Sequence, residues 1–170
     1  MSRRACHQSQ TNIIRFAAFS SSASCWATGT IRSAKIGADD GNENEDDWSM
    51  DIRKLDELTP FTTKDGSEIR ELLAYRNSVI RNQSLAEARL PVGGATQEHY
   101  HSKTEEIYYI THGTGKMRIE DETREVRAGD AIAIPPGQKH KLWNTGQETL
   151  RLLCCCAPAY EHSDTVITED

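Results

Sequence analysis

Short hydrophobic runs separated by polar turn residues dominate the chain from Met50 to Asp170. The runs are rich in Ile, Val, Tyr, Leu and Thr, and a turn segment follows every few residues, which is typical of antiparallel β-structure. We predict nine strands, at residues 71–75, 85–90, 96–101, 106–110, 116–119, 124–127, 131–134, 140–143 and 150–156.

The segments between these runs contain the residue types that tight turns require. Gly, Pro, Asn or Asp occurs in each connection, and these residues adopt turn dihedral angles at low cost. Nine short strands within about 90 residues indicate an all-β sandwich or barrel. A few apolar residues in 51–58 are compatible with one or two helical turns, and we find no long amphipathic helix. The connections lie at residues 91–94, 112–115, 120–122, 129–130, 136–137 and 144–146.

Charge divides the chain before the strands begin. Residues 1–38 contain five basic residues and no acid, whereas residues 39–47 contain six acids and no base. The basic part is also rich in Ser and Ala, which is typical of an organellar transit peptide. An extension upstream of a true start at Met50 explains the same break, and we weigh the two interpretations equally. In either case we predict a disordered extension at 1–49 and one domain at 50–170, with its barrel at about 65–160.

Composition narrows the class of protein. The chain has 170 residues and a net charge of −6, so it lacks the basic surface that attracts nucleic acid or anionic lipid. Its longest apolar run, residues 150–157, is far shorter than the roughly 20 residues of a membrane span. Five cysteines, three of them adjacent, do not form a secreted disulfide pattern. We expect no nucleic-acid or membrane partner and a reducing, cytoplasmic location, or an organellar one if residues 1–38 are a transit peptide.

Three side chains in the first half of the domain could share one metal ion. Side chains alternate across a strand, so His99 and His101 project from the same face. Glu106 opens the next predicted strand after a short connection, and we expect a hairpin to bring its carboxylate back beside the two histidines.

A fourth donor comes from far along the sequence. Pro136 and Gly137 suit the central positions of a type II turn, with a fixed φ at Pro and a positive φ at Gly, and His140 begins the strand that follows. Three imidazoles and one carboxylate bind one divalent transition metal, namely Fe, Mn, Ni, Co, Cu or Zn. On an octahedral ion they leave two positions open for other ligands. His112, beside a turn glycine, and His162, near the C-terminus, are expected to be surface residues.

The two segments that carry these donors resemble the two cupin motifs. The first has a Gly, five residues, His-x-His, four residues, Glu, six residues and Gly; the second has a Gly, five residues, Pro-x-Gly, two residues, His, three residues and Asn. The resemblance implies a single-domain cupin β-barrel, or jelly roll, with one divalent metal in its mouth, and often a homodimer. The matching positions are Gly93, His99, His101, Glu106, Gly113, Gly129, Pro135, Gly137, His140 and Asn144.

Strand alternation extends the inward face beyond the four donors. Gln97 and Tyr108 are our candidate catalytic residues, because an amide or a phenol can hold a ligand or bind a substrate oxygen. A packed Tyr and a solvent-facing Gln are an equally weighted alternative. We expect Ile110 and Leu142 on the same inward face, with an apolar pocket lining of Met117 and Ile119 or of Ile132 and Ile134. Three arginines precede the first motif and are more typical of solvated residues than of an anion clamp. They are Arg76, Arg81 and Arg89.

Two further features have a structural and a functional interpretation. In the cysteine triplet, Cys154 and Cys156 should face one way and Cys155 the other, and we favour buried, inert thiols over redox chemistry. Trp143 should face away from His140, where it would pack on a second sheet or in a dimer interface.

Three functions are compatible with this sequence. The first is a metal-dependent enzyme acting on an oxygen-bearing small molecule, and the resemblance implies dioxygenase or other oxidoreductase, lyase or decarboxylase, or sugar-phosphate isomerase chemistry. The fold does not select among these reactions. The second is a non-catalytic module that binds a small ligand or a metal. The third, a structural metal site, requires every coordination position to be filled.

Overall fold

The computed structural model describes residues 49–169. The predicted extension at 1–49, with its transit-peptide and start-site interpretations, therefore lies outside the described residues except for its last position. No helix among the described residues is long and apolar enough to cross a membrane.

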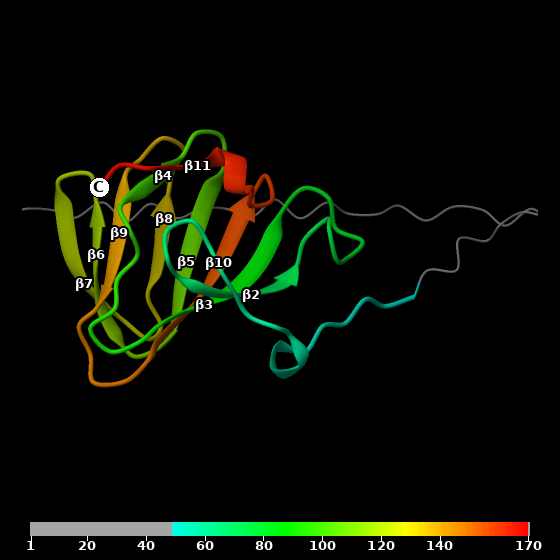
Figure 1. The fold of residues 1–170 in the computed structure, drawn as a ribbon, viewed down its shortest axis with the longest axis horizontal. Helices are drawn as coiled ribbons and strands as arrows, with labels where there is room; N and C mark the ends of the chain where they lie inside the picture. The colour runs from blue at the N-terminus through cyan, green and yellow to red at the C-terminus, as the bar shows by residue number, and fades with distance from the viewer. Residues whose placement is uncertain (1–48, 170) are drawn as a thin grey trace, which may run out of the picture. The chain divides into compact units, whose positions relative to one another are not determined.

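The described chain is nearly all β, as predicted, and forms two antiparallel sheets whose inner faces share one core (Figure 1). One sheet has the strand order β1-β2-β3-β10-β5-β8, and the other has the order β11-β4-β9-β6-β7. The strands are β1 (Phe61–Thr62), β2 (Glu68–Leu73), β3 (Ser84–Leu90), β4 (His99–His101), β5 (Glu105–His112), β6 (Thr114–Ile119), β7 (Glu122–Arg127), β8 (Ala131–Ile134), β9 (His140–Asn144), β10 (Leu150–Ala157) and β11 (Thr165–Ile167).

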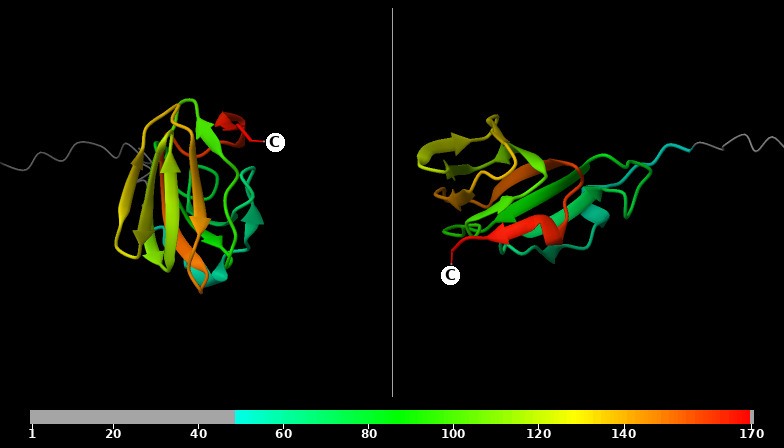
Figure 2. Two further views of the ribbon diagram at one scale, coloured as in Figure 1. Left: turned by 90° about the vertical axis from the view of Figure 1, so that its left-hand side faces the viewer. Right: turned by 90° about the horizontal axis from the view of Figure 1, so that it is seen from above.

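Each of the nine predicted strands overlaps an observed strand, and the predicted bounds of β8 are correct. The strand predicted at 71–75 lies earlier, as β2, and its pairing with β3 is irregular between Glu71 and Leu73. The helical turns expected at 51–58 are reduced to one 3-10 turn, Leu55–Glu57. Two short strands, β1 and β11, were not predicted, and β11 pairs with β4 at the edge of its sheet (Figure 2).

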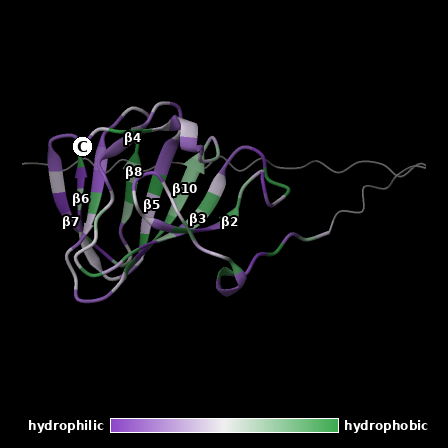
Figure 3. Ribbon diagram, in the orientation of Figure 1, coloured by the Kyte–Doolittle hydropathy of each residue, from purple (hydrophilic) through white to green (hydrophobic). Residues whose placement is uncertain are grey.

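The core lies between the two sheets because the strands alternate in burial. In β5 the residues Glu106, Tyr108 and Ile110 are buried while their neighbours are exposed. The opposite sheet contributes Met117 and Leu142 to the same core. Hydrophobic residues accordingly recur within the strands of both sheets, whereas the connections are largely hydrophilic (Figure 3). The predicted inward positions of Tyr108, Ile110 and Leu142 are confirmed.

One predicted local arrangement is wrong. β4 and β5 do not form a hairpin, because β4 pairs with β9 and β11 in one sheet while β5 pairs with β10 and β8 in the other. The short connection between them therefore crosses from one sheet to the other. Glu106 faces the histidines across the core instead of lying beside them on a neighbouring strand.

The turn before β9 agrees with the sequence analysis. Gly137 has a φ of +80°, and the backbone N–H of Gln138 donates a hydrogen bond to the carbonyl of Pro135 at 3.3 Å. This arrangement leaves Pro136 and Gly137 at the two central positions, as a type II turn requires. The strand that follows begins at His140.

Trp143 lies on the outer side of its sheet and is half-buried. Three cationic side chains surround its ring, with charged atoms 5.1 Å (Lys116), 5.4 Å (Arg118) and 5.3 Å (Lys141) from the ring centroid. These distances are typical of cation–π contacts. The expectation that Trp143 packs on a second sheet is therefore wrong, and its place in a dimer interface stays a prediction.

Gly115 offers a test of how closely the strands pack. A Cβ at this position of β6 would lie 2.6 Å from the backbone oxygen of Trp143 and 2.9 Å from a side-chain carbon of Leu150. The Gly115→Ala variant should lower the free energy of unfolding by about 1–3 kcal/mol, as overpacking does. Urea unfolding measures this, with Arg124→Ala on exposed β7 as a control expected within about 0.5 kcal/mol of the parent. Equal losses in the two variants would contradict this packing.

Candidate metal centre

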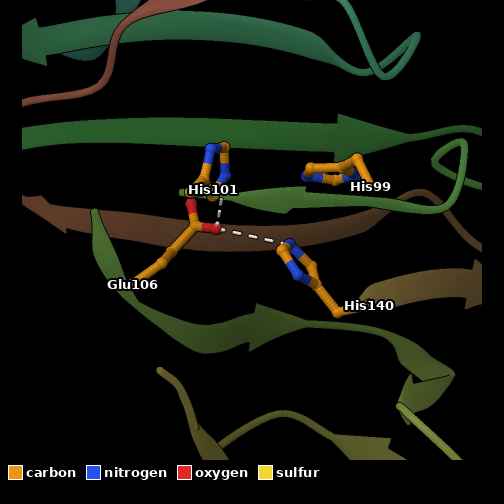
Figure 4. Close-up of side chains that lie close together, drawn as sticks. All are labelled: His99, His101, Glu106 and His140. Atoms are coloured by element: carbon orange, nitrogen blue, oxygen red, sulfur yellow. Dashed lines mark ion pairs between the residues drawn. The ribbon is translucent and has the colours of Figure 1, made fainter. Parts of the chain in front are cut away.

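Three elements bring the four predicted metal ligands together. His99 and His101 lie on β4, His140 lies opposite His99 on β9, and Glu106 lies on β5 of the other sheet. All four are buried, with at most 5% of each residue exposed. One ligand atom from each lies within 4.8 Å of the others, and the four side chains converge on one point (Figure 4).

The hydrogen bonds of the histidines orient their rings. The Nδ1 of His99 lies 2.7 Å from the carbonyl oxygen of Gln97, and the Nδ1 of His140 lies 3.0 Å from that of Gln138. A carbonyl can only accept, so both Nδ1 atoms carry the proton and each Nε2 keeps a free lone pair. The Nδ1 of His101 lies 3.3 Å from the hydroxyl of Thr165 on β11. Such contacts hold the rings of metal-binding histidines.

The carboxylate of Glu106 completes the cluster. Its Oε2 lies 3.3 Å from the Nε2 of His101 and 3.5 Å from the Nε2 of His140. Among the described residues, Glu106 Oε2 and His140 Nε2 are buried without a hydrogen-bond partner. Unsatisfied buried polar atoms are costly, and a cation between them would satisfy both. The donor set of three imidazoles and one carboxylate therefore fits one divalent transition metal.

Burial acts in opposite directions on the pKa values of Glu106 and His99, but both pKa values are lowered overall. Burial alone would raise the pKa of Glu106, but the adjacent imidazoles of His101 and His140 lower it more, to about 2. Burial lowers the pKa of His99, and the neighbouring His140 lowers it further. Each shift favours the deprotonated form that a metal ion binds.

His99, His101 and Glu106 line a cavity, as does Leu142. The fully buried His140 does not line it, and neither do the predicted apolar lining residues Met117, Ile119, Ile132 and Ile134. Tyr108, 4% exposed, lines this cavity, and its ring centroid lies 5.9 Å from that of His140. Gln97 does not line it. The prediction that its side chain points inward is wrong, because Gln97 precedes β4 and its side chain is exposed. Only its backbone carbonyl reaches the site, through His99.

Three residues that the sequence analysis did not single out line the same cavity, namely Asp65, Tyr160 and Thr165. Asp65 lies in the turn between β1 and β2, and Tyr160 and Thr165 lie before and in β11. The ring of Tyr160 meets that of His101 edge to face, at 5.9 Å between centroids. An Asp-Gly pair such as residues 65–66 is typical of a turn, but nothing local indicates that this turn packs on the metal cluster.

The other charged candidates lie away from this cavity. Arg76 pairs with Glu71 and Glu161, Arg89 pairs with Glu87, and Arg81 donates to the carbonyls of Ser78 and Ile80. His112 is exposed and lies 2.6 Å from Glu148, and His162 is exposed in a 3-10 turn. None of the three arginines or of these two histidines lines the cavity.

The cysteine triplet follows the predicted alternation. Cys154 and Cys156 are buried and line the cavity, whereas Cys155 faces the other side and is half-buried. The thiol of Cys156 donates a hydrogen bond to Glu106 Oε1 at 3.3 Å. Burial, followed by the charge of Glu106, raises the pKa of all three thiols, most strongly for Cys154 and Cys156. They are therefore protonated near neutral pH.

Comparison with known proteins places this geometry in a family. A family model described as a cupin domain matches residues 86–156. An uncharacterised protein of Methanocaldococcus jannaschii is 50% identical over 116 residues, which cover 68% of this chain and 93% of that protein.

Two solved structures resemble the described fold. One is described as a predicted oxalate decarboxylase from Thermotoga maritima, with 26% identity, a TM-score of 0.57, and coverage of 63% of this chain and 98% of that one. The other is the polyketide cyclase RemF from Streptomyces resistomycificus, with 21% identity, a TM-score of 0.60, and coverage of 72% and 87%. At its lower identity the second supports the fold alone.

Acid should destabilise the metal-free protein. Because the pKa of His99 is lowered on folding, the unfolded chain takes up a proton there that the folded chain does not, and stability falls as pH drops below about 6.5. Below about pH 4.5 the lowered pKa of Glu106 adds to the loss. Urea midpoints at pH 7.5 and 5.5 measure the first effect. His99→Gln should reduce the difference between them and His112→Gln should not; equal differences in all three proteins would contradict this assignment.

The thiols should differ in reactivity. Iodoacetamide should modify half-buried Cys155 before Cys154 and Cys156, which are buried and have the more strongly raised pKa values. Mass spectrometry of the native protein over time gives the order. Modification of Cys156 as fast as in the urea-unfolded chain would show that its thiol is accessible.

Proposed function

Because this chain belongs to the cupin superfamily, we propose that it is a metal-dependent enzyme acting on a small oxygen-bearing molecule held against one divalent metal. One observation carries this proposal: three imidazoles and one carboxylate converge on one point, and three of these four ligands line a cavity. Four protein ligands leave two positions on an octahedral ion, and a cavity beside those positions favours exchangeable ligands over a closed structural site.

The residues around the ion would have separate roles. His99, His101, Glu106 and His140 would hold the metal, which as a Lewis acid polarises a bound oxygen. Tyr108 would contact the substrate from the side of Glu106. Burial and the charge of Glu106 raise the pKa of Tyr108 well above its usual value, so its hydroxyl would stay protonated and donate a hydrogen bond to substrate oxygen.

The reaction type belongs to the same proposal. The resemblance to a structure described as a predicted oxalate decarboxylase favours lyase chemistry as a reaction class, without carrying over the substrate. The resemblance to the polyketide cyclase, at 21% identity, supports the fold and favours no reaction. Oxygen consumption by the metal-loaded protein would favour an oxidoreductase instead. Metal-dependent turnover without oxygen would favour a lyase or an isomerase.

A non-catalytic binding module is the second candidate. The same cavity and donor set could retain a small ligand without turning it over, and the apolar side chains that share the cavity wall favour such retention. Recovery of the added compound unchanged, after tight binding to the metal-loaded protein, would favour this function over catalysis.

Metal binding and ligand access are tested together with Co(II). The protein should bind one equivalent, and azide should change the visible spectrum because exogenous ligands can reach the ion. His140→Ala should weaken the binding of Co(II) by more than about 100-fold, since it removes a ligand and not only a residue that supports one.

The exposed His112 provides the matched control, and His112→Ala should bind Co(II) as the parent does. Equal affinity of His140→Ala and the parent would contradict the donor set. A Co(II) spectrum that azide leaves unchanged would contradict the enzyme proposal and favour a structural ion.

A further inference from the structure

Asp65 is a buried carboxylate in the cavity that the enzyme proposal does not use. It lies in the turn between β1 and β2 and lines the same cavity as the metal ligands His99, His101 and Glu106, with 6% of the residue exposed. Among the described residues it forms no ion pair, because its hydrogen-bond partners are neutral. A buried charge without a cationic partner is costly and is a frequent sign of function.

The hydrogen bonds of Asp65 leave one oxygen with spare capacity. Oδ1 lies 2.6 Å from the hydroxyl of Thr63, 2.9 Å from that of Ser67 and 3.3 Å from the backbone nitrogen of Ser67. Oδ2 has only the Ser67 hydroxyl, at 3.1 Å, and that hydroxyl has a single proton for both oxygens. A carboxylate can accept about four hydrogen bonds, so Oδ2 can accept from a ligand in the cavity.

Two contacts attach this turn to the metal centre. The carbonyl of Asp65 accepts a hydrogen bond of 2.7 Å from the backbone N–H of Gln97, two residues before His99. The neighbouring Lys64 donates to the carbonyl of Thr165 at 2.6 Å, beside the hydroxyl that contacts His101. The lysine adjacent to Asp65 is thus bonded to a backbone carbonyl and does not pair with the Asp65 carboxylate.

The ionisable side chains that line the cavity include carboxylates and two metal-binding histidines, but no lysine or arginine. The carboxylates are those of Asp65, Glu71 and Glu106. Glu71 pairs with Arg76 and Glu106 lies beside the histidines, so Asp65 is the lining carboxylate without a basic partner. A ligand carboxylate can be neutralised at the metal, but a second one at Asp65 would meet an acid and no cation. Hydroxyl groups, in contrast, would find an acceptor in Asp65.

We propose that Asp65 forms a hydroxyl-recognition subsite in the cavity that the metal ligands line, and that the substrate is a small hydroxylated compound with one metal-binding end and not a dicarboxylate. This inference rests on the proposed function, because it needs a ligand anchored at the metal. The distal hydroxyl of the ligand donates a hydrogen bond to Asp65 Oδ2. Asp65 selects the substrate by its capacity to accept a hydrogen bond, and the metal binds the other end.

A purely structural role of Asp65 makes a different prediction. The turn is closed by backbone hydrogen bonds from Thr63 N to Ser67 O and from Gly66 N to Thr63 O, each 3.0 Å long. Asn at position 65 keeps the Oδ1 acceptor for Thr63 and Ser67 but replaces Oδ2 by an NH₂ donor. Asp65→Asn should therefore preserve the turn and replace the acceptor at the Oδ2 position by a hydrogen-bond donor.

The experiment compares two ligands that differ only at the distal end. Both 2,4-dihydroxybutanoate and malate have four carbons and an α-hydroxy carboxylate for the metal, and they end in a hydroxymethyl group and a carboxylate, respectively. Calorimetric titration of the Co(II)-loaded protein should give at least about tenfold tighter binding of 2,4-dihydroxybutanoate. Asp65→Asn should weaken 2,4-dihydroxybutanoate about tenfold and leave malate unchanged or tighter.

The matched control is Asp121→Asn, on an exposed residue next to β7. It should bind both ligands as the parent does, and all three proteins should contain one Co(II) and have the same melting temperature. The inference is overturned if the parent prefers malate, if Asp65→Asn weakens both ligands equally, or if it loses Co(II). If azide changes the Co(II) spectrum but neither ligand binds, the subsite is wrong and the proposed function stands; if azide also has no effect, the proposed function fails.

Discussion

The structure depends on the burial of three imidazoles and one carboxylate around one point between two sheets. Without a cation, Glu106 Oε2 and His140 Nε2 are buried polar atoms with no partner among the described residues, which a folded chain tolerates only where something else satisfies them. The two sheets must therefore be held at a separation that lets β5 present Glu106 to β4 and β9. Apolar core residues such as Leu142 and Ile110 are fully buried between the sheets. Their close packing maintains that separation.

The sequence predicted the site more accurately than the path of the chain that builds it. Alternation in a strand is local, so the inward positions of Glu106, Tyr108 and Ile110 could be predicted from β5 alone. The hairpin between β4 and β5 was inferred from a short connection, but short connections also join strands of different sheets, and only tertiary pairing distinguishes the two cases. The four ligands converge in either arrangement, which is why the donor set was correct although the hairpin was not.

The remaining errors have the same physical origin. Gln97 would point inward if the strand began before it, but β4 begins at His99 and Gln97 contributes its backbone carbonyl instead. Asp65 and Thr165 reach the cavity through β1 and β11, strands of two and three residues with too few positions to show a period. The local pattern of hydrophobic and polar residues cannot assign a residue to a site when its position depends on such a short edge strand. The residues that these edge strands bring to the cavity were therefore missed, whereas the four metal ligands were predicted.

The thiols beside the metal centre explain why the donor set is limited to nitrogen and oxygen. The pairing of β10 with β5 places Cys156 opposite Glu106, close enough for its thiol to hydrogen-bond Glu106 Oε1. Burial and the charge of Glu106 raise the pKa of Cys156, so the sulfur stays protonated and acts as a donor to the carboxylate. A thiolate would attract softer ions, but a protonated thiol does not bind them. By holding Oε1, Cys156 leaves Oε2 directed toward His101 and His140, so the cysteine triplet positions a ligand without being one.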